Sequence, residues 1–249
     1  MKNQYVADIG DYGKYSLLRA FSDAGVKVGV NWYLTDYDGS TDGEIRGYLN
    51  KETFRQYDPF VFDRLKQINE STNRTVEAIQ NSDILSNVDF YDEVLSFDGT
   101  PKERKLKRNK WLNNSFSVLC DSELLFLDPD NGLLVRDNPS LKISDKYVLP
   151  SEVKAYWDAN HNVVYYCHRG RRSDKQWQEY MCVMRKTIQE SRIIVLTYHK
   201  GTQRSYVFLV RNKQYNRYRT ILDRVLNNWK GVFTDERIEN DEAVASTHD

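Results

Sequence analysis

Hydrophobic residues along the chain follow two spacings, one helical and one typical of strands. Where apolar positions recur three and four residues apart, one face of a helix is buried. This spacing predicts helices over residues 11–24, 44–50, 59–80, 102–118, 151–159, 175–189 and 215–229. We expect a break near residues 71–73, and Asp11 and Ser151 are placed to cap two of these helices.

Short, nearly continuous apolar runs separate these helices and have the length of buried strands. They predict strands over residues 26–34, 88–94, 123–127, 162–167, 192–198 and 205–211. Because strands and helices alternate until a final hairpin near Gly201, we expect an α/β fold. The expected architecture is a Rossmann-like three-layer sandwich with a mostly parallel sheet and a C-terminal antiparallel hairpin.

The same pattern predicts one domain over residues 1–235, with a helical insertion at about residues 50–110 and a flexible acidic tail over 236–249. Polar loops follow three of the predicted strands, at residues 35–43, 128–132 and 168–172. The carboxyl ends of parallel strands lie on one edge of a sheet, where ligands bind in such folds. We therefore expect the functional site at this edge.

The loop Asp128-Pro129-Asp130-Asn131-Gly132 directly follows a buried strand and is the first candidate for the site. Two carboxylates at a strand end can hold a divalent cation, or act as a base and its orienting group. The alternative is an ordinary tight turn, which these residue types also favour. The candidate catalytic residues are Asp128, Asp130, Asn131 and His168, and the last could contact a phosphate or act as an acid.

Two further segments carry polar groups suited to a ligand. Residues 8–15 place acids and a lysine at a helix start, where backbone N–H groups can bind an anion, although an ordinary helix cap explains them equally well. The loop after the first strand is acidic and contains glycine. The candidate cofactor-binding residues are Asp8, Asp11, Lys14, Asp36, Asp38 and Gly39.

The net charge does not indicate a nucleic-acid partner, because 36 basic residues balance 36 acidic residues among the 249. Two local basic runs favour binding of a phosphate backbone, and the alternative is a solvated helix face. The candidate nucleic-acid contacts are Arg104, Lys105, Arg108, Arg169, Arg171 and Arg172. Three scattered cysteines and the lack of a 20-residue apolar run favour a soluble, cytoplasmic protein that does not enter a membrane.

The order of elements resembles the class I methyltransferase superfamily, in particular the bacterial large-subunit ribosomal RNA adenine-N6 methyltransferases. A lysine-bearing helix precedes the first strand, Asp128-Pro129 ends the fourth strand of the family pattern, and an antiparallel hairpin closes the chain. The resemblance implies S-adenosylmethionine as cofactor and a nucleic-acid base as substrate. In that family an Asp/Asn-Pro-Pro-aromatic motif accepts hydrogen bonds from the target amine.

This chain departs from the family pattern at two places. Asp130 and Asn131 replace the second proline and the aromatic residue, and the glycine cluster after the first strand is missing. Three hypotheses follow. The protein is a methyltransferase-like enzyme acting on nucleic acid, a Mg²⁺-dependent nuclease or phosphohydrolase that uses Asp128 and Asp130 with Lys146 or His168, or a non-catalytic nucleotide- or protein-binding module.

Overall fold

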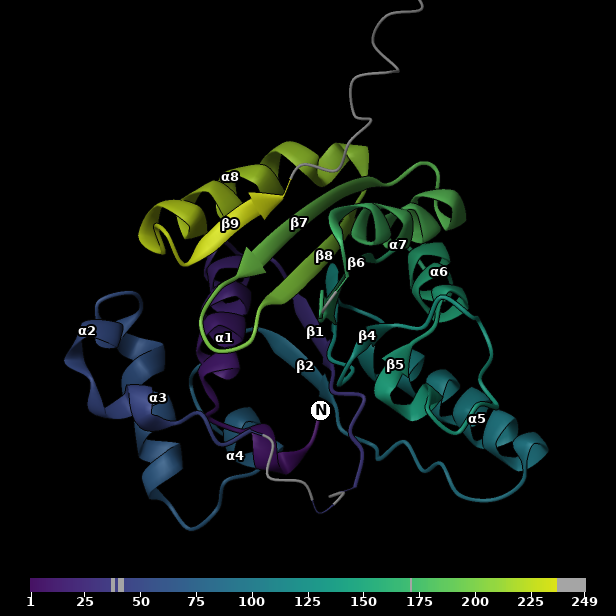
Figure 1. Cartoon of the computed structure of the whole chain (residues 1–249), viewed down its shortest axis with the longest axis horizontal. Coiled ribbons are helices and arrows are strands. Elements are labelled where there is room, and N and C mark those ends of the chain that lie inside the picture. Colours follow the sequence, from purple (N-terminus) through teal and green to yellow (C-terminus); the bar gives the residue numbers. More distant parts are fainter. Residues whose placement is uncertain (37–38, 40–42, 171, 237–249) are drawn as a thin grey trace, which may run out of the picture.

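The computed structural model describes residues 1–36, 39, 43–170 and 172–236. Within them lies a sheet of seven strands in the order β2-β1-β3-β6-β8-β7-β9 (Figure 1). The first four strands in this order are parallel, and each later strand is antiparallel to its neighbour. The strands are β1 (Val28–Asn31), β2 (Val88–Tyr91), β3 (Leu124–Leu127), β6 (Asn162–Cys167), β7 (Arg192–Tyr198), β8 (Arg204–Val210) and β9 (Phe233–Glu236).

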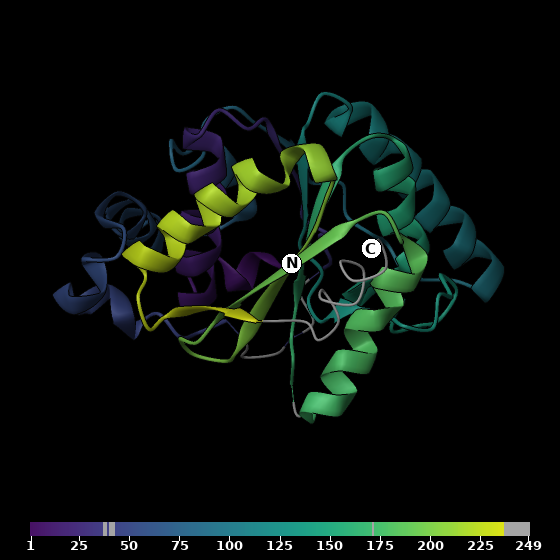
Figure 2. The ribbon, with the colours of Figure 1, turned by 90° about the horizontal axis from the view of Figure 1, so that it is seen from above.

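Helices lie on both sides of this sheet, as Figure 2 shows, with α1 and α8 on one side and α5, α6 and α7 on the other. The helices are α1 (Ile9–Asp23), α2 (Glu52–Arg55), α3 (Pro59–Glu70), α4 (Val76–Gln80), α5 (Pro101–Leu119), α6 (Pro150–Asp158), α7 (Asp174–Thr187) and α8 (Asn212–Asn228). Short 3-10 turns are η1 (Asn3–Tyr5), η2 (Gly47–Asn50) and η3 (Ser144–Lys146). A small parallel pair joins β4 (Gly132–Leu133) to β5 (Tyr147–Val148).

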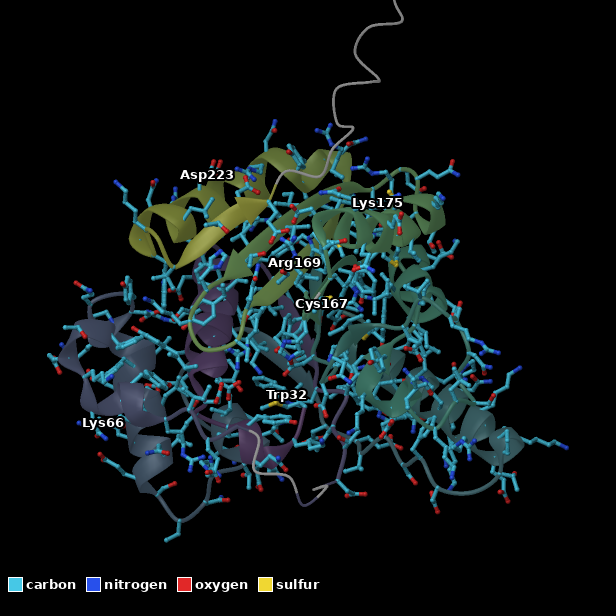
Figure 3. All side chains as sticks on the ribbon, viewed as in Figure 1. Trp32, Lys66, Cys167, Arg169, Lys175 and Asp223 are labelled. Carbon is cyan, nitrogen blue, oxygen red and sulfur yellow. The ribbon has the colours of Figure 1, made fainter. Side chains whose placement is uncertain are left out.

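The central strands are apolar at consecutive positions because both of their faces are covered. Leu124 and Phe126 of β3 pack in the core beneath α1 and α8, whereas Leu125 and Leu127 pack in the core beneath α5, α6 and α7. A strand that faces water on one side would alternate apolar and polar residues. Figure 3 shows Trp32 and Cys167 inside the molecule, and the charged Lys66, Lys175 and Asp223 at its periphery.

Several sequence-based expectations are confirmed. The fold is mixed α/β with antiparallel strands at its C-terminal end, and the predicted helix 59–80 is divided into α3 and α4. Other expectations were wrong in detail. Asp8 rather than Asp11 caps α1, by accepting a hydrogen bond from the backbone N–H of Gly10, and Leu149 rather than Ser151 is the N-cap of α6. The predicted strand 26–34 contains only the four residues of β1.

The hydrophobic pattern did not predict α2, β4, β5 or β9, which have two to four residues each. Periodicity needs a longer segment to be visible, and β9 carries the polar sequence Phe-Thr-Asp-Glu. Glu236, placed in the predicted tail, belongs to β9, and residues 237–249 lie outside the described part of the chain. Among the described helices, none has the length and apolar character needed to span a membrane.

Candidate functional site

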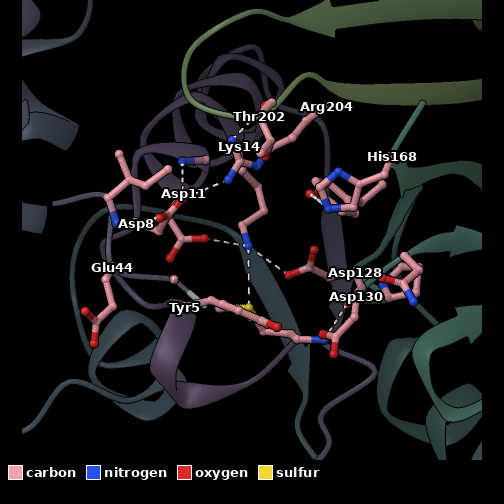
Figure 4. A pocket seen from close by; sticks show the side chains of 17 residues that line it. Tyr5, Asp8, Asp11, Lys14, Glu44, Asp128, Asp130, His168, Thr202 and Arg204 are labelled. Atoms are coloured by element: carbon pink, nitrogen blue, oxygen red, sulfur yellow. Dashed lines mark hydrogen bonds and ion pairs between the residues drawn. The ribbon is translucent and has the colours of Figure 1, made fainter. Parts of the chain in front are cut away.

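A cavity of about 380 Å³ lies at the carboxyl edge of the parallel strands. Its walls come from the start of α1, the segments after β3 and β6, and the β7–β8 turn (Figure 4). The charged groups and the histidine that line it are the Met1 amine, Asp8, Asp11, Lys14, Glu44, Asp128, Asp130, His168 and Arg204. Among these described residues the five carboxylates outnumber the cations Lys14, Arg204 and the Met1 amine, even when Lys2 Nζ, which lies on Asp130, is counted with them. The cavity therefore favours a ligand that carries positive charge.

Lys14 is the central cation of the cavity, as Figure 4 shows. Its Nζ lies 2.7 Å from Asp11 Oδ1 and 2.8 Å from Asp128 Oδ2, and all three side chains are buried. Burial alone would lower the pKa of Lys14, but the charges of Asp11 and Asp128 hold it well above its usual value. Burial raises the pKa of Asp11 to about 6. Lys14 is therefore a fixed positive charge that orients Asp128.

The hairpin β7–β8 holds the start of α1 in place beside the cavity. Arg204 Nη2 lies 2.9 Å from Asp8 Oδ1, and the Tyr198 hydroxyl donates to the Ile9 carbonyl at 3.1 Å. The close approach of Arg204 to the start of α1 depends on Gly10, because a Cβ added at this position would clash with the Arg204 guanidinium. Residues nearly 200 positions apart thus build one wall of the site.

Asp128 and Asp130 follow β3 and both reach the cavity, with different partners. Asp128 Oδ2 binds Lys14, and its Oδ1 makes no hydrogen bond to the residues that the structure describes. Asp130 Oδ1 lies 2.8 Å from the Met1 amine, and Asp130 Oδ2 lies 3.0 Å from Lys2 Nζ. Burial alone would raise the pKa of Asp130, but these two cations hold it below its usual value.

Tyr166 and His168 form the opposite wall, at the end of β6. The Tyr166 hydroxyl lies 2.7 Å from His168 Nε2. Burial and the nearby positive charge of Arg204 hold the pKa of His168 below its usual value. The imidazole is therefore neutral at pH 7, when it can accept a proton.

A second cavity, of about 350 Å³, lies at the carboxyl ends of β1 and β2. Leu34 and Val94 give it apolar walls. Its polar walls come from Lys2, Asn3, Gln4, Thr35, Asp36 and Arg74. The Thr35 hydroxyl is buried and has no hydrogen-bond partner among the described residues. The segment from Met1 to Tyr5 lies between the two cavities, since its residues line both of them.

The structure brings together most of the residues predicted for the site. The first cavity is lined by Asp8, Asp11, Lys14, Asp128, Asp130, Asn131 and His168, and the second by Asp36. Gly39 is exposed and lines neither cavity. Asp38 and Arg171 lie outside the described residues. The three predicted loops, where described, do follow parallel strands at one edge of the sheet.

The predicted basic face of α5 was wrong for two of its arginines. Arg108 is buried and binds Glu152 through two bonds, of 2.6 and 2.9 Å, as well as the Ser144 carbonyl. Arg104 is buried and donates to the Ser140 carbonyl. Both side chains fix the loop after β4 against α5, because a buried guanidinium must find acceptors. Lys105 is exposed.

Sequence reasoning missed Tyr5, Glu44, Tyr166 and Arg204 as cavity residues. Tyr166 carried a usable signal, because it lies at a strand end two residues before His168 and alternation puts both on one face. Arg204 carried none, since only the tertiary fold brings the hairpin to α1.

The described residues contain no group of three or more His, Cys, Asp or Glu side chains placed to hold a metal ion such as Mg²⁺.

Comparisons with known proteins give only a distant likeness. No protein-family model matches the chain, and no curated protein matches it. The crystal structure of protein LPL1258 from Legionella pneumophila, described with the family model DUF519, is similar with a TM-score of 0.46 and 11% identity. The match covers 93% of this chain and 96% of that chain. This likeness is too weak to support a statement about function.

Proposed function

We propose that the protein is a methyltransferase-like enzyme that uses S-adenosylmethionine to methylate an exocyclic amine of a nucleic-acid base. One observation carries the proposal. Asp128 lies inside the cavity at the end of β3, with Oδ2 bound to Lys14 and Oδ1 without a hydrogen bond to any described residue. A carboxylate oxygen held in this way is an acceptor for an N–H group of a ligand.

The arrangement of the sheet supports a Rossmann-like scaffold of the methyltransferase class. Parallel β2, β1, β3 and β6 are followed by an antiparallel hairpin whose second strand, β8, lies between β6 and β7. The superfamily that the sequence resembles also closes with an antiparallel hairpin. Asp128-Pro129 follows the strand at which that superfamily carries its amine-binding motif.

The residues at the two cavities fit S-adenosylmethionine. The excess of carboxylates in the first cavity suits a positively charged sulfonium. The second cavity offers the apolar side chains of Leu34 and Val94. The buried Thr35 hydroxyl has no hydrogen-bond partner among the described residues, and a polar atom of the ligand would provide one. Asp36 could accept hydrogen bonds from ribose hydroxyls. When bound, the cofactor would supply an electrophilic methyl group.

The protein's own residues would position the amine that receives this methyl group. Asp128 Oδ1 and the Pro129 carbonyl, both at the cavity, would accept its two hydrogens and so direct the nitrogen lone pair. Lys14 would hold Asp128 in this orientation through the 2.8 Å ion pair. The buried surroundings would exclude water from the reacting nitrogen.

Basic side chains on the loop after β6 and at the start of α7 support a polyanionic substrate. Two of them already have partners, since Arg169 pairs with Asp174 and Arg172 donates to the His168 and Arg169 carbonyls. Arg169 and Arg172 follow His168 on the loop after β6, and Lys175 is exposed at the start of α7. These groups would contact phosphates on either side of a base held in the cavity. The Mg²⁺ hypothesis stays a prediction, and it has less support because ammonium groups already occupy Asp128 and Asp130.

A methyl-transfer assay tests the proposal. The wild type would be incubated with S-adenosylmethionine labelled in its methyl group and with RNA or DNA, and the nucleosides released by digestion would be separated. We expect label on an exocyclic amine, with a loss of at least about 100-fold in Asp128→Ala. The matched control is Asp121→Ala, at an exposed acid before the start of β3. Cofactor binding without transfer to either nucleic acid would favour the non-catalytic hypothesis instead.

A further inference from the structure

The Tyr166–His168 pair is a titratable cluster in the first cavity that the proposed function leaves without a role. Methylation of an amine produces a positively charged nitrogen, which must release a proton to give the neutral product. Asp128, bound to Lys14, orients the amine, and a carboxylate paired with an ammonium is a weak base. The cavity therefore needs another proton acceptor close to Asp128.

The register of the sheet places Tyr166 beside Asp128. Phe126 of β3 is paired with Val164 of β6, and Asp128 and Tyr166 each follow two residues later. Side chains two residues apart point to the same face of a strand. Both side chains accordingly point toward α1, where Asp128 meets Lys14 and Tyr166 joins the core beneath that helix.

The hydrogen bond at 2.7 Å connects the Tyr166 hydroxyl to His168 Nε2. The His168 ring is also bonded to the backbone of Gln203, an interaction that favours its protonated form. The charged groups facing the pair are Arg204 from β8, Asp130 and Asp128 after β3, and Lys14 from α1. The imidazole is neutral at pH 7, so its Nε2 can accept a proton from the Tyr166 hydroxyl. The backbone of Gln203, which is bonded to the ring, then stabilises the imidazolium that forms.

Resting on the proposed function, we infer that Tyr166 and His168 form a proton relay for the methylated amine. As the N–H bond of the methylated amine breaks, its proton passes to Tyr166 Oη, while the hydroxyl proton of Tyr166 passes to His168 Nε2. The electron pair of the N–H bond stays on nitrogen, so the amine becomes neutral and His168 becomes the imidazolium. His168 then returns the proton to solvent through the loop after β6, where its side chain is partly exposed.

The relay predicts a specific pH dependence of the methyl-transfer rate. In the wild type the rate should fall only at pH values below the usual imidazole pKa of about 6.5, because burial and Arg204 hold the pKa of His168 below that value and a protonated His168 cannot accept a proton. Tyr166→Phe removes the connecting oxygen, and His168→Gln keeps a hydrogen-bonding group but cannot carry the proton. Both variants should lose about 100-fold in rate at pH 8 and should lose the acid limb of the profile.

The test measures methyl-transfer rates between pH 5 and 9 for the wild type, Tyr166→Phe, His168→Gln and the control His199→Gln. His199 lies outside the first cavity, and its Nε2 is hydrogen-bonded to the Thr234 hydroxyl. Cofactor affinity, measured by calorimetry, should be unchanged in all variants. A lower rate with the acid limb still present would mean a structural role, and an unchanged profile would also overturn the relay while leaving the proposed function intact. A wild type that transfers no methyl group at any pH would overturn the proposed function and the relay together.

Discussion

Replacing Lys14 by methionine should destabilise the protein in a way that depends on pH. The substitution keeps most of the side-chain volume but removes the ammonium that lies within 2.8 Å of both Asp11 and Asp128. Two buried carboxylates would then face each other without a cation between them. The loss should be larger at pH 8 than at pH 5, because Asp11, whose pKa burial raises to about 6, is ionised at pH 8 and mostly protonated at pH 5.

The magnitude follows from the geometry. Both carboxylates lie within 2.8 Å of one nitrogen, so their charges are about 5 Å apart and would repel by about 3 kcal/mol at an effective dielectric constant of about 20. Removing one partner from a buried ion pair costs about 3–5 kcal/mol. We therefore expect the free energy of unfolding of Lys14→Met to fall by about 3–5 kcal/mol at pH 8.

The pH dependence has a definite sign. Without Lys14, whose charge lowers the pKa of Asp11, that pKa rises further in the folded state, and the folded protein then binds more protons than the unfolded chain. Stability consequently falls as pH rises. The difference between wild type and variant should thus increase from pH 5 to pH 8.

Urea unfolding of the wild type and two variants checks this prediction. The control is Lys154→Met, which breaks the exposed pair between Lys154 and Asp158 on α6, with side chains 49% and 55% exposed. An exposed pair of this kind contributes about 0.5 kcal/mol. Equal losses in Lys14→Met and Lys154→Met at pH 8, or a loss in Lys14→Met that does not change with pH, would refute the role assigned to Lys14.

Three further predictions concern other parts of the molecule. Arg108→Met should lower the free energy of unfolding by about 3–5 kcal/mol because it leaves Glu152 buried without its cation, and urea unfolding measures this loss. Gly132→Ala should cost at least about 1–3 kcal/mol, since Gly132 has φ +108° and an added Cβ would lie 2.7 Å from Cys167 Sγ; a thermal midpoint equal to that of the wild type would contradict it. The pKa of Asp11 is 3.8 in the unfolded chain and about 6 in the folded protein. Between these two pH values the folded wild type binds a proton at Asp11 that the unfolded chain has lost, so its stability falls as pH rises. Asp11→Asn should remove this part of the pH dependence of stability.

The helices and buried strands could be predicted because their signals are local. The segments Leu124–Leu127 and Asn162–Cys167 are apolar at nearly every position, which both identifies them as strands and places them between two layers of helices. The edge of the sheet that carries the first cavity followed from their parallel direction, and Asp128 and His168 were expected at that edge for this reason.

What the sequence could not provide depends on contacts between distant segments. Whether an arginine in a basic run faces solvent or a buried carboxylate depends on its tertiary neighbours, and Arg108 meets Glu152 from 44 residues away. Arg204 joins Asp8 across 196 residues. The departure at Asp130 is now explained in physical terms, because its carboxylate binds Lys2 and the Met1 amine at the cavity.

The most direct test of the account is a calorimetric titration of the wild type with S-adenosylmethionine. The two adjoining cavities, the excess of carboxylates and the unpartnered Thr35 hydroxyl predict saturable binding at one site, with weaker binding in Thr35→Val. Equal affinity in the variant would place the cofactor away from the second cavity. A wild type that releases no heat at millimolar cofactor would contradict the proposal that this protein is a methyltransferase.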